Sequence, residues 1–271
     1  MNRINQTLAK TRKDGRKALI TYIVNGDPVS DATLATMHKM VEAGVDIIEL
    51  GVPFSDPMAE GPVIALGHER ALANKTSLKS TMAVVKAFRQ TNNDTPIILM
   101  GYANPVERMG YEAFANNASK VGVDGLLTVD LPPEEAGLLN LELQKVGIEN
   151  IFLLAPTTTV ERAKYIASMA GGFLYYVSLK GVTGAGHLDV GSVEAKVAQL
   201  RQLTDLPICV GFGIKDADTA KAIAKTADGA VVGSLLVEKM GSMAGQPVES
   251  IADAVVELIE PIRKGLDELA S

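Results

Sequence analysis

Three acidic residues lie close together in the segment IIELGVPFSDPMAEGP, residues 47–62. Glu49 falls inside an apolar run, whereas Asp56 and Glu60 follow in a turn that is rich in Gly and Pro. A carboxylate held in apolar surroundings loses hydration, so its pKa rises and it can exchange protons near neutral pH. We therefore predict acid–base chemistry at this segment.

Each of these acids also has a structural interpretation. Glu49 could be a buried acid that a structural partner satisfies, and Glu60 could be an ordinary solvated loop residue. Asp56 precedes a Pro and could simply cap a turn, and the same applies to Asp130 after a later apolar run. The spacing alone leaves these alternatives open.

A second group of segments is rich in Gly, Ser and Thr: SLKGVTGAGH (178–187), GFGI (211–214) and GSLL (233–236). Gly lets backbone N–H groups approach an anion, and a helix starting at LLVEKM would add the partial positive charge of its N-terminus. Together the segments predict a site for a phosphorylated small molecule, although any one of them could be a turn that needs Gly. GFGIKD lacks the last Gly or Ala of a dinucleotide fingerprint, and no P-loop pattern occurs.

Other kinds of catalytic centre lack their patterns. His38, His68 and His187 show no metal-ligand spacing, so we expect no metal site. Cys209 is the only cysteine and is expected in the core. Lys180 follows an apolar run but lies in a Gly-rich loop, which makes it a poor candidate for a Schiff-base lysine.

Composition excludes several classes of protein. The net charge of −6 argues against nonspecific nucleic-acid binding, which needs a basic surface. A single cysteine permits no intrachain disulfide, so a cytoplasmic location is expected. No apolar run approaches the length of a membrane span, and the first residues lack the apolar core of a secretory signal.

The elements that must position these residues alternate along the chain. Short apolar runs predict strands at 18–24, 46–52, 96–102, 125–130, 151–156, 173–178, 207–213 and 229–234. Helical spacing occurs near 31–43, 79–91, 112–120, 134–146, 160–169, 193–203 and 216–226. Eight such βα units favour an α/β protein built as a (β/α)8 TIM barrel, and a doubly wound open sheet is the alternative.

We expect one domain over residues 1–271, with a short N-terminal helix and a closing C-terminal helix kinked at Pro261. Catalytic residues of such barrels lie at the carboxyl ends of the strands. If Ile48 and Leu50 face the helices, Glu49 faces the barrel axis.

Four segments, in their order and spacing, resemble the tryptophan synthase alpha subunit family: ELGVPFSDPMAEGP, GVDGLLTVDLPPEE, YYVSLKGVTGAG and VGFGIKD. NGDP, GYANPV and VVGSLLV agree with the same family, so the resemblance spans nearly the whole chain. It implies retro-aldol cleavage of indole-3-glycerol phosphate to indole and glyceraldehyde 3-phosphate in tryptophan biosynthesis.

The resemblance also implies roles for individual residues. Glu49 would be the principal acid and base, and Glu60 would hold the indole N–H and stabilise charge on the ring. Gly184, Gly213, Gly233 and Ser234 would hold the phosphate, and Tyr175 and Thr183 match positions near the active site. Closure of the loop 179–190 would couple this site to that of a partner.

That partner would be a β subunit carrying pyridoxal phosphate, in an α2β2 tetramer, while this chain would carry no cofactor. Phe54, Asp56, Asn104 and Pro105 match the surface that meets the partner.

One departure from the family pattern concerns Glu60, because the usual loop reads DPxADGP with Asp at this position. Glu is longer by one C–C bond, roughly 1.5 Å, and we expect the rest of the site to compensate. The alternative is a catalytically weak subunit that mainly activates its partner.

Another phosphate-binding barrel enzyme would need a strand-end Lys or His, for which we find no candidate.

Overall fold

The computed structural model describes residues 2–177, 190–211 and 213–270. Its strands are β1 Ala18–Val24, β2 Ile47–Gly51, β3 Ile97–Gly101, β4 Gly125–Thr128, β5 Glu149–Asn150, β6 Phe152–Leu154, β7 Leu174–Val177, β8 Ile208–Gly211 and β9 Gly229–Val232. All pairings between them are parallel, in the order β5-β4-β3-β2-β1-β9-β8-β7-β6. Because β1 pairs with both β2 and β9, the first and last strands are neighbours, as a barrel requires.

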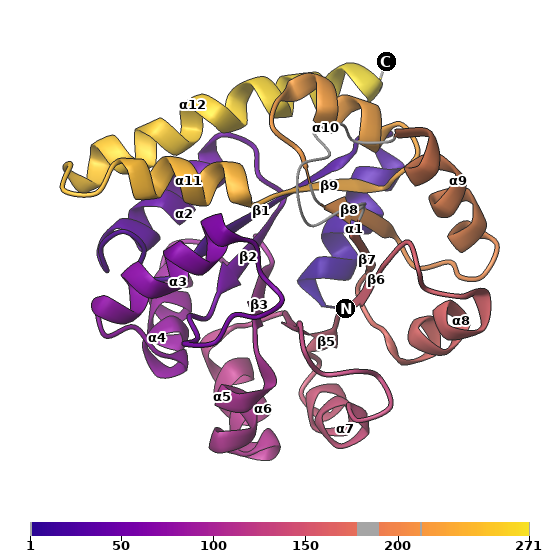
Figure 1. Ribbon diagram of the computed structural model, residues 1–271, viewed down its shortest axis with the longest axis horizontal. Coiled ribbons are helices and arrows are strands. Elements are labelled where there is room, and N and C mark those ends of the chain that lie inside the picture. Colours follow the sequence, from indigo (N-terminus) through magenta and orange to yellow (C-terminus); the bar gives the residue numbers. More distant parts are fainter. Residues whose placement is uncertain (1, 178–189, 212, 271) are drawn as a thin grey trace.

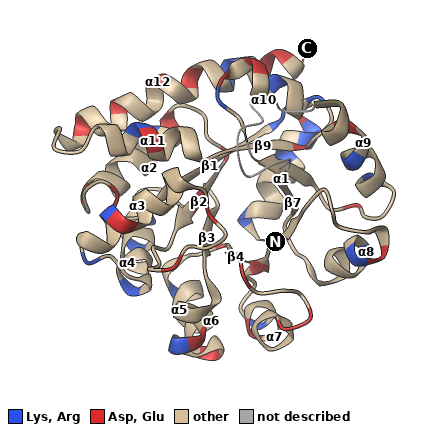
Figure 2. Ribbon diagram, viewed as in Figure 1, with Lys and Arg blue, Asp and Glu red and all other residues tan. Residues whose placement is uncertain are grey.

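Helices surround this sheet (Figure 1). They are α1 Arg3–Lys13, α2 Ala32–Glu42, α3 Pro62–Ala73, α4 Leu78–Phe88, α5 Ala103–Met109, α6 Tyr111–Val121, α7 Gly137–Lys145, α8 Val160–Met169, α9 Val190–Arg201, α10 Ala217–Ala224, α11 Ser234–Ser242 and α12 Val248–Asp267, followed by the 3-10 turn Glu268–Ala270. None of these helices is both long enough and apolar enough to cross a membrane. Lys and Arg alternate with Asp and Glu over the outer helices (Figure 2).

The barrel prediction is confirmed, with one difference in the strand count. In place of the single strand expected at 151–156 there are two short strands: β5, which precedes that run and pairs with β4, and β6, which lies within it and pairs with β7. Ile151 joins the two pieces, and its N–H donates to the carbonyl oxygen of Leu126 in β4 at 2.9 Å. The two ends of the sheet order are therefore adjacent in the chain, and the cylinder closes through Ile151.

The inner and outer faces of the strands carry different apolar sets. The inner set includes Ile20, Ile47, Ile98, Leu127, Phe173, Cys209 and Val231, together with Ile4 and Leu8 of α1. Ile48 and Leu50 of β2 belong instead to the layer beneath the helices. Since neighbours along a strand point to opposite faces, Glu49 points into the barrel, as predicted. The contacts of Ile4 and Leu8 show that α1 closes the amino end of the barrel.

Two helices were missing from the sequence-based set, α3 and the short α5. The C-terminal helix α12 contains Pro261 and continues past it to Asp267. Local side chains fix several helix starts: Ser77 and Ser80 form a capping box at α4, and Asp216 accepts from the N–H of Thr219 at α10.

Candidate active site

Glu49 lies inside the barrel, near the carboxyl end of β2. Its side chain is fully buried, and neither carboxylate oxygen has a hydrogen-bond partner among the described residues. Burial and, secondly, the nearby charge of Glu60 raise the pKa of Glu49 to about 8. A structural acid would have its oxygens satisfied by donors, so the structural interpretation of Glu49 does not fit.

Glu60 reaches the same mouth from the loop between β2 and α3. The loop turns sharply here, because the N–H of Glu60 donates to the carbonyl oxygen of Pro57 at 3.0 Å. Glu60 is half-buried, and burial raises its pKa to about 7. It is therefore no ordinary solvated loop acid.

The two carboxyl groups differ in the order in which they lose their protons. Glu49 holds its proton to the higher pH, with a pKa of about 8 against about 7 for Glu60, and the charge on Glu60 is one cause of that higher value. Near neutral pH the mouth can therefore hold a protonated Glu49 beside an ionised Glu60. In that state Glu49 can donate a proton. The Glu60 carboxylate can accept a hydrogen bond from an N–H group or stabilise a positive charge.

Two tyrosines share the barrel interior with Glu49, one on the neighbouring strand and one on a strand farther round the barrel. Tyr22 of β1 is the direct neighbour of Glu49 in the parallel register. Tyr175 of β7 is 9% exposed, and its hydroxyl would lie 2.2 Å from a Cβ built at Gly211 of β8, so only glycine fits there. The charges of Glu49 and Glu60 help burial to raise the pKa of both tyrosines. Both phenols therefore stay neutral donors at the mouth.

The Gly-rich side of the mouth is formed by the ends of β8 and β9. Gly213 is exposed and has a φ of +78°, which favours glycine. Ser234 begins α11 directly after Gly233, which has no side chain to cap the first N–H groups of the helix. Thr183 and Gly184, together with Lys180 and His187, lie outside the described residues.

The residues predicted to meet a partner lie around the loop after β2 and at the start of α5. The ring of Phe54 stacks on Tyr102 with centroids 5.1 Å apart, and the N–H of Ala59 donates to the Tyr102 hydroxyl at 3.0 Å. Tyr102 thus ties the loop to the segment that leads into α5. Asp56 and Asn104 are exposed and Pro105 is half-buried.

Comparison with known proteins identifies the family. The sequence profile described as "Tryptophan synthase alpha chain" matches residues 8–266. The protein of that name from Marinobacter nauticus is 53% identical over 270 residues, covering 100% of both chains. The one from Methylococcus capsulatus is 53% identical over 267 residues, covering 98% of this chain and 100% of its own.

This chain belongs to the tryptophan synthase alpha chain family. The crystal structure of tryptophan synthase subunit alpha from Legionella pneumophila superimposes with a TM-score of 0.91 at 41% identity, covering 99% of both chains. The fold and the family resemblance read from the sequence are confirmed. The chain is accordingly a carbon–carbon lyase of tryptophan biosynthesis that carries out the alpha reaction.

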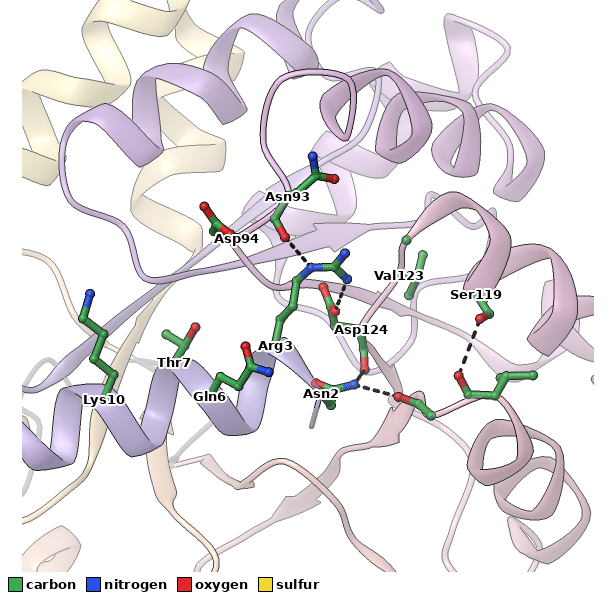
Figure 3. A pocket seen from close by; sticks show the side chains of 13 residues that line it. Asn2, Arg3, Gln6, Thr7, Lys10, Asn93, Asp94, Ser119, Val123 and Asp124 are labelled. Atoms are coloured by element: carbon green, nitrogen blue, oxygen red, sulfur yellow. Dashed lines mark hydrogen bonds and ion pairs between the residues drawn. The ribbon is translucent and has the colours of Figure 1, made fainter.

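The amino end of the barrel, opposite the two acids, carries a hollow with paired polar groups in its lining. A hollow of about 640 Å³ lies between α1 and the loops before β3, β4 and β5 (Figure 3). Arg3 donates to an Asp124 oxygen at 2.8 Å, and Asn2 donates to the carbonyl oxygen of Gly147 at 2.8 Å. The amino end of such barrels serves stability, and the paired groups here fit that role. The described residues hold no group of three His, Cys, Asp or Glu side chains suited to a metal ion.

Sequence reasoning missed three side chains at the mouth: Tyr22, His68 and Tyr102. His68 is 1% exposed and joins Tyr22 to the loop backbone through its two ring nitrogens. The signal for His68 was present in α3, where the buried residues Ile64, His68 and Ala71 have helical spacing after Pro62. Tyr22 could not be placed beside Glu49 without the register of β1 on β2.

Proposed function

We propose that this chain cleaves indole-3-glycerol phosphate with Glu49 as acid and base and Glu60 as the carboxylate that holds the indole N–H. The observation that carries the proposal is Glu49, a fully buried carboxyl group without a partner among the described residues. Leaving such a group unpaired costs stability, which a catalytic role explains.

The reaction needs two proton transfers at one carboxyl group, one from Glu49 and one to it. Protonated Glu49 gives its proton to indole C3, which becomes tetrahedral while the ring nitrogen gains positive charge. Ionised Glu60 accepts a hydrogen bond from that N–H and stabilises the charge. Glu49, now ionised, takes the proton from the hydroxyl next to the ring. The C–C bond breaks, its electron pair restores the indole, and the hydroxyl carbon becomes the aldehyde of glyceraldehyde 3-phosphate.

The phosphate of the substrate would bind at Gly213, Gly233 and Ser234, with Thr183 and Gly184 completing the site. The positive φ of Gly213 and the start of α11 at Ser234 support this assignment, because free N–H groups at such positions bind anions. Tyr175 would line the mouth between the phosphate and Glu49.

The family membership further supports a β subunit as partner. We assign the contact surface to Phe54, Asp56, Asn104 and Pro105, within an α2β2 tetramer. Pyridoxal phosphate would belong to the partner, this chain would need no cofactor, and the complex would work in the cytoplasm. Met58, in the same loop as Phe54, is 89% exposed, which suits an interface.

Turnover of indole-3-glycerol phosphate by the purified chain tests the proposal. We expect slow release of glyceraldehyde 3-phosphate from the chain alone and faster release after addition of the β subunit of a relative. A chain inactive in both conditions would instead be an activating subunit, the alternative that Glu60 raises. Fast turnover alone, without any effect of the β subunit, would contradict the assigned partner.

A further inference from the structure

A buried hydrogen-bonded chain runs from the loop after β2 to Tyr22. The backbone N–H of Phe54 donates to Nδ1 of His68 at 3.1 Å, and Nε2 of His68 lies 3.2 Å from the Tyr22 hydroxyl oxygen. Since Nδ1 accepts, the ring proton of neutral His68 is on Nε2, which therefore donates to Tyr22. Burial lowers the pKa of His68, which keeps the ring neutral. The O–H of Tyr22 is then left with its own proton to donate elsewhere.

The ring of Tyr22 reaches this position by crossing β2. A Cβ built at Gly51 would lie 2.5 Å from the Tyr22 hydroxyl oxygen, so a side chain at position 51 would displace the phenol. The hydroxyl consequently lies at the end of β2, where the loop carrying Glu60 begins, and α3 with His68 lies beside it (Figure 1). The ionisable groups that act on Tyr22 are Glu60 first and Glu49 second, followed by Tyr102 and Tyr175.

Glu60 needs a partner of this kind. Burial raises its pKa, and the described residues give its carboxylate no donor that would offset the effect. Its side chain also has one more rotatable bond than the Asp usual in the family. A misplacement of about 1 Å at a reacting group can cost on the order of 100-fold in rate. A donor at a fixed place would select one position of the longer side chain.

We infer that Tyr22 is a positioning residue for Glu60, with His68 orienting the Tyr22 hydroxyl so that its O–H donates to the Glu60 carboxylate. The inference rests on the catalytic role of Glu60 proposed above. The bond between Tyr22 and Glu60 forms when substrate binds, since hydrogen bonds of catalytic groups commonly tighten only in the complex.

The test is a double-mutant cycle between Tyr22→Phe and Glu60→Asp, read by kcat/KM and by the pH dependence of kcat. Tyr22→Phe removes only the hydroxyl, and we expect kcat/KM to fall about 10-fold, as for loss of a hydrogen bond to a charged group. The acidic limb of the pH profile of kcat should move to higher pH, because the ionised form of Glu60 loses a donor in the enzyme–substrate complex. In the Glu60→Asp background the same substitution should change kcat/KM less than about twofold, because the shorter carboxylate does not reach Tyr22.

Three further variants separate positioning from packing. Tyr176→Phe removes a hydroxyl from a tyrosine that is 1% exposed on the helix side of β7, and it should leave kcat/KM and the pH profile unchanged. His68→Leu should reproduce the loss caused by Tyr22→Phe, and His68→Gln, which keeps an N–H donor, should restore most of it. Thermal unfolding of every variant checks that the fold is intact.

The outcomes distinguish the inference from the proposed function. The inference is overturned if Tyr22→Phe causes equal losses in the parent chain and in the Glu60→Asp variant, or if the pH profile does not move. The proposed function still stands in that case, provided that the parent chain has lyase activity. A parent chain without lyase activity, alone and with the β subunit, would overturn both.

Discussion

The two ends of the barrel treat a buried carboxylate in opposite ways. At the amino end, Asp124 is 3% exposed and accepts from Arg89 at 2.8 Å, from Arg3 at 2.8 Å and from the N–H of Ile97 at 2.9 Å. At the carboxyl end, Glu49 is equally buried and has none of these donors among the described residues. Burial of a carboxyl group alone therefore does not indicate function. Burial without hydrogen-bond donors does.

The difference also separates two uses of burial. The donors around Asp124 connect α1 and the end of α4 to the strands, so the acid serves the fold. The apolar setting of Glu49 instead keeps its proton on at neutral pH, so the acid serves the reaction. Variants at the two positions should accordingly separate activity from stability.

The largest expected effect is on activity, from Glu49→Gln. The amide keeps the shape of the side chain but cannot transfer a proton, so kcat should fall about 1000-fold, within the range for general acid–base catalysis. Steady-state assay with saturating β subunit measures it. Glu69→Gln, an exposed acid on α3, is the matched control and should keep full activity. Retention of more than about a tenth of the parent kcat by Glu49→Gln would remove Glu49 from the mechanism.

The next effect is on stability, from Asp124→Ala. The substitution leaves Arg89 buried without its carboxylate, and removal of one partner of a buried pair costs about 3 kcal/mol. Urea unfolding measures this loss, and the kcat of the folded fraction should not change. Asp94→Ala, an exposed acid at the same end, should alter stability by less than about 0.5 kcal/mol. A large fall in kcat for Asp124→Ala would mean that the two ends are coupled.

The smallest effect for a single step in conditions is the change of stability with one pH unit. The pKa of Glu49 is about 8 in the folded chain and near 4.5 when unfolded, so the folded state binds the extra proton between these values. Stability is then highest at the acidic side and falls as pH rises toward 8, by at most about 1.4 kcal/mol per pH unit. Urea unfolding at a series of pH values from about 5 to about 8 should show this fall in the parent. The fall should be smaller in Glu49→Gln, and identical slopes for the two chains would contradict the raised pKa.

Part of this arrangement is readable from the sequence. Because side chains alternate along a strand, Glu49 points away from the face that carries Ile48 and Leu50. Ile48 and Leu50 lie beneath the helices, as expected. Glycine-rich ends after β8 and β9 likewise follow from local composition. These features depend on neighbours along the chain, which is why one sequence suffices for them.

Features that depend on distant pairing could not be read. Tyr22 stands beside Glu49 only because of the register of β1 on β2, and no local pattern specifies that register. The break of one strand at Ile151 arises from pairing to β4 on one side and β7 on the other. The helix α5 is only 7 residues long, too short to show a reliable period.

The glycine at position 211 has a consequence for the range of molecules that the mouth admits. The phenol of Tyr175 lies over that glycine and fills space that a side chain would otherwise take. At this point the interior is therefore lined by an aromatic ring from the neighbouring strand rather than by a side chain of β8. A shorter residue at position 175 would open space over Gly211 without any change to the loops of the mouth.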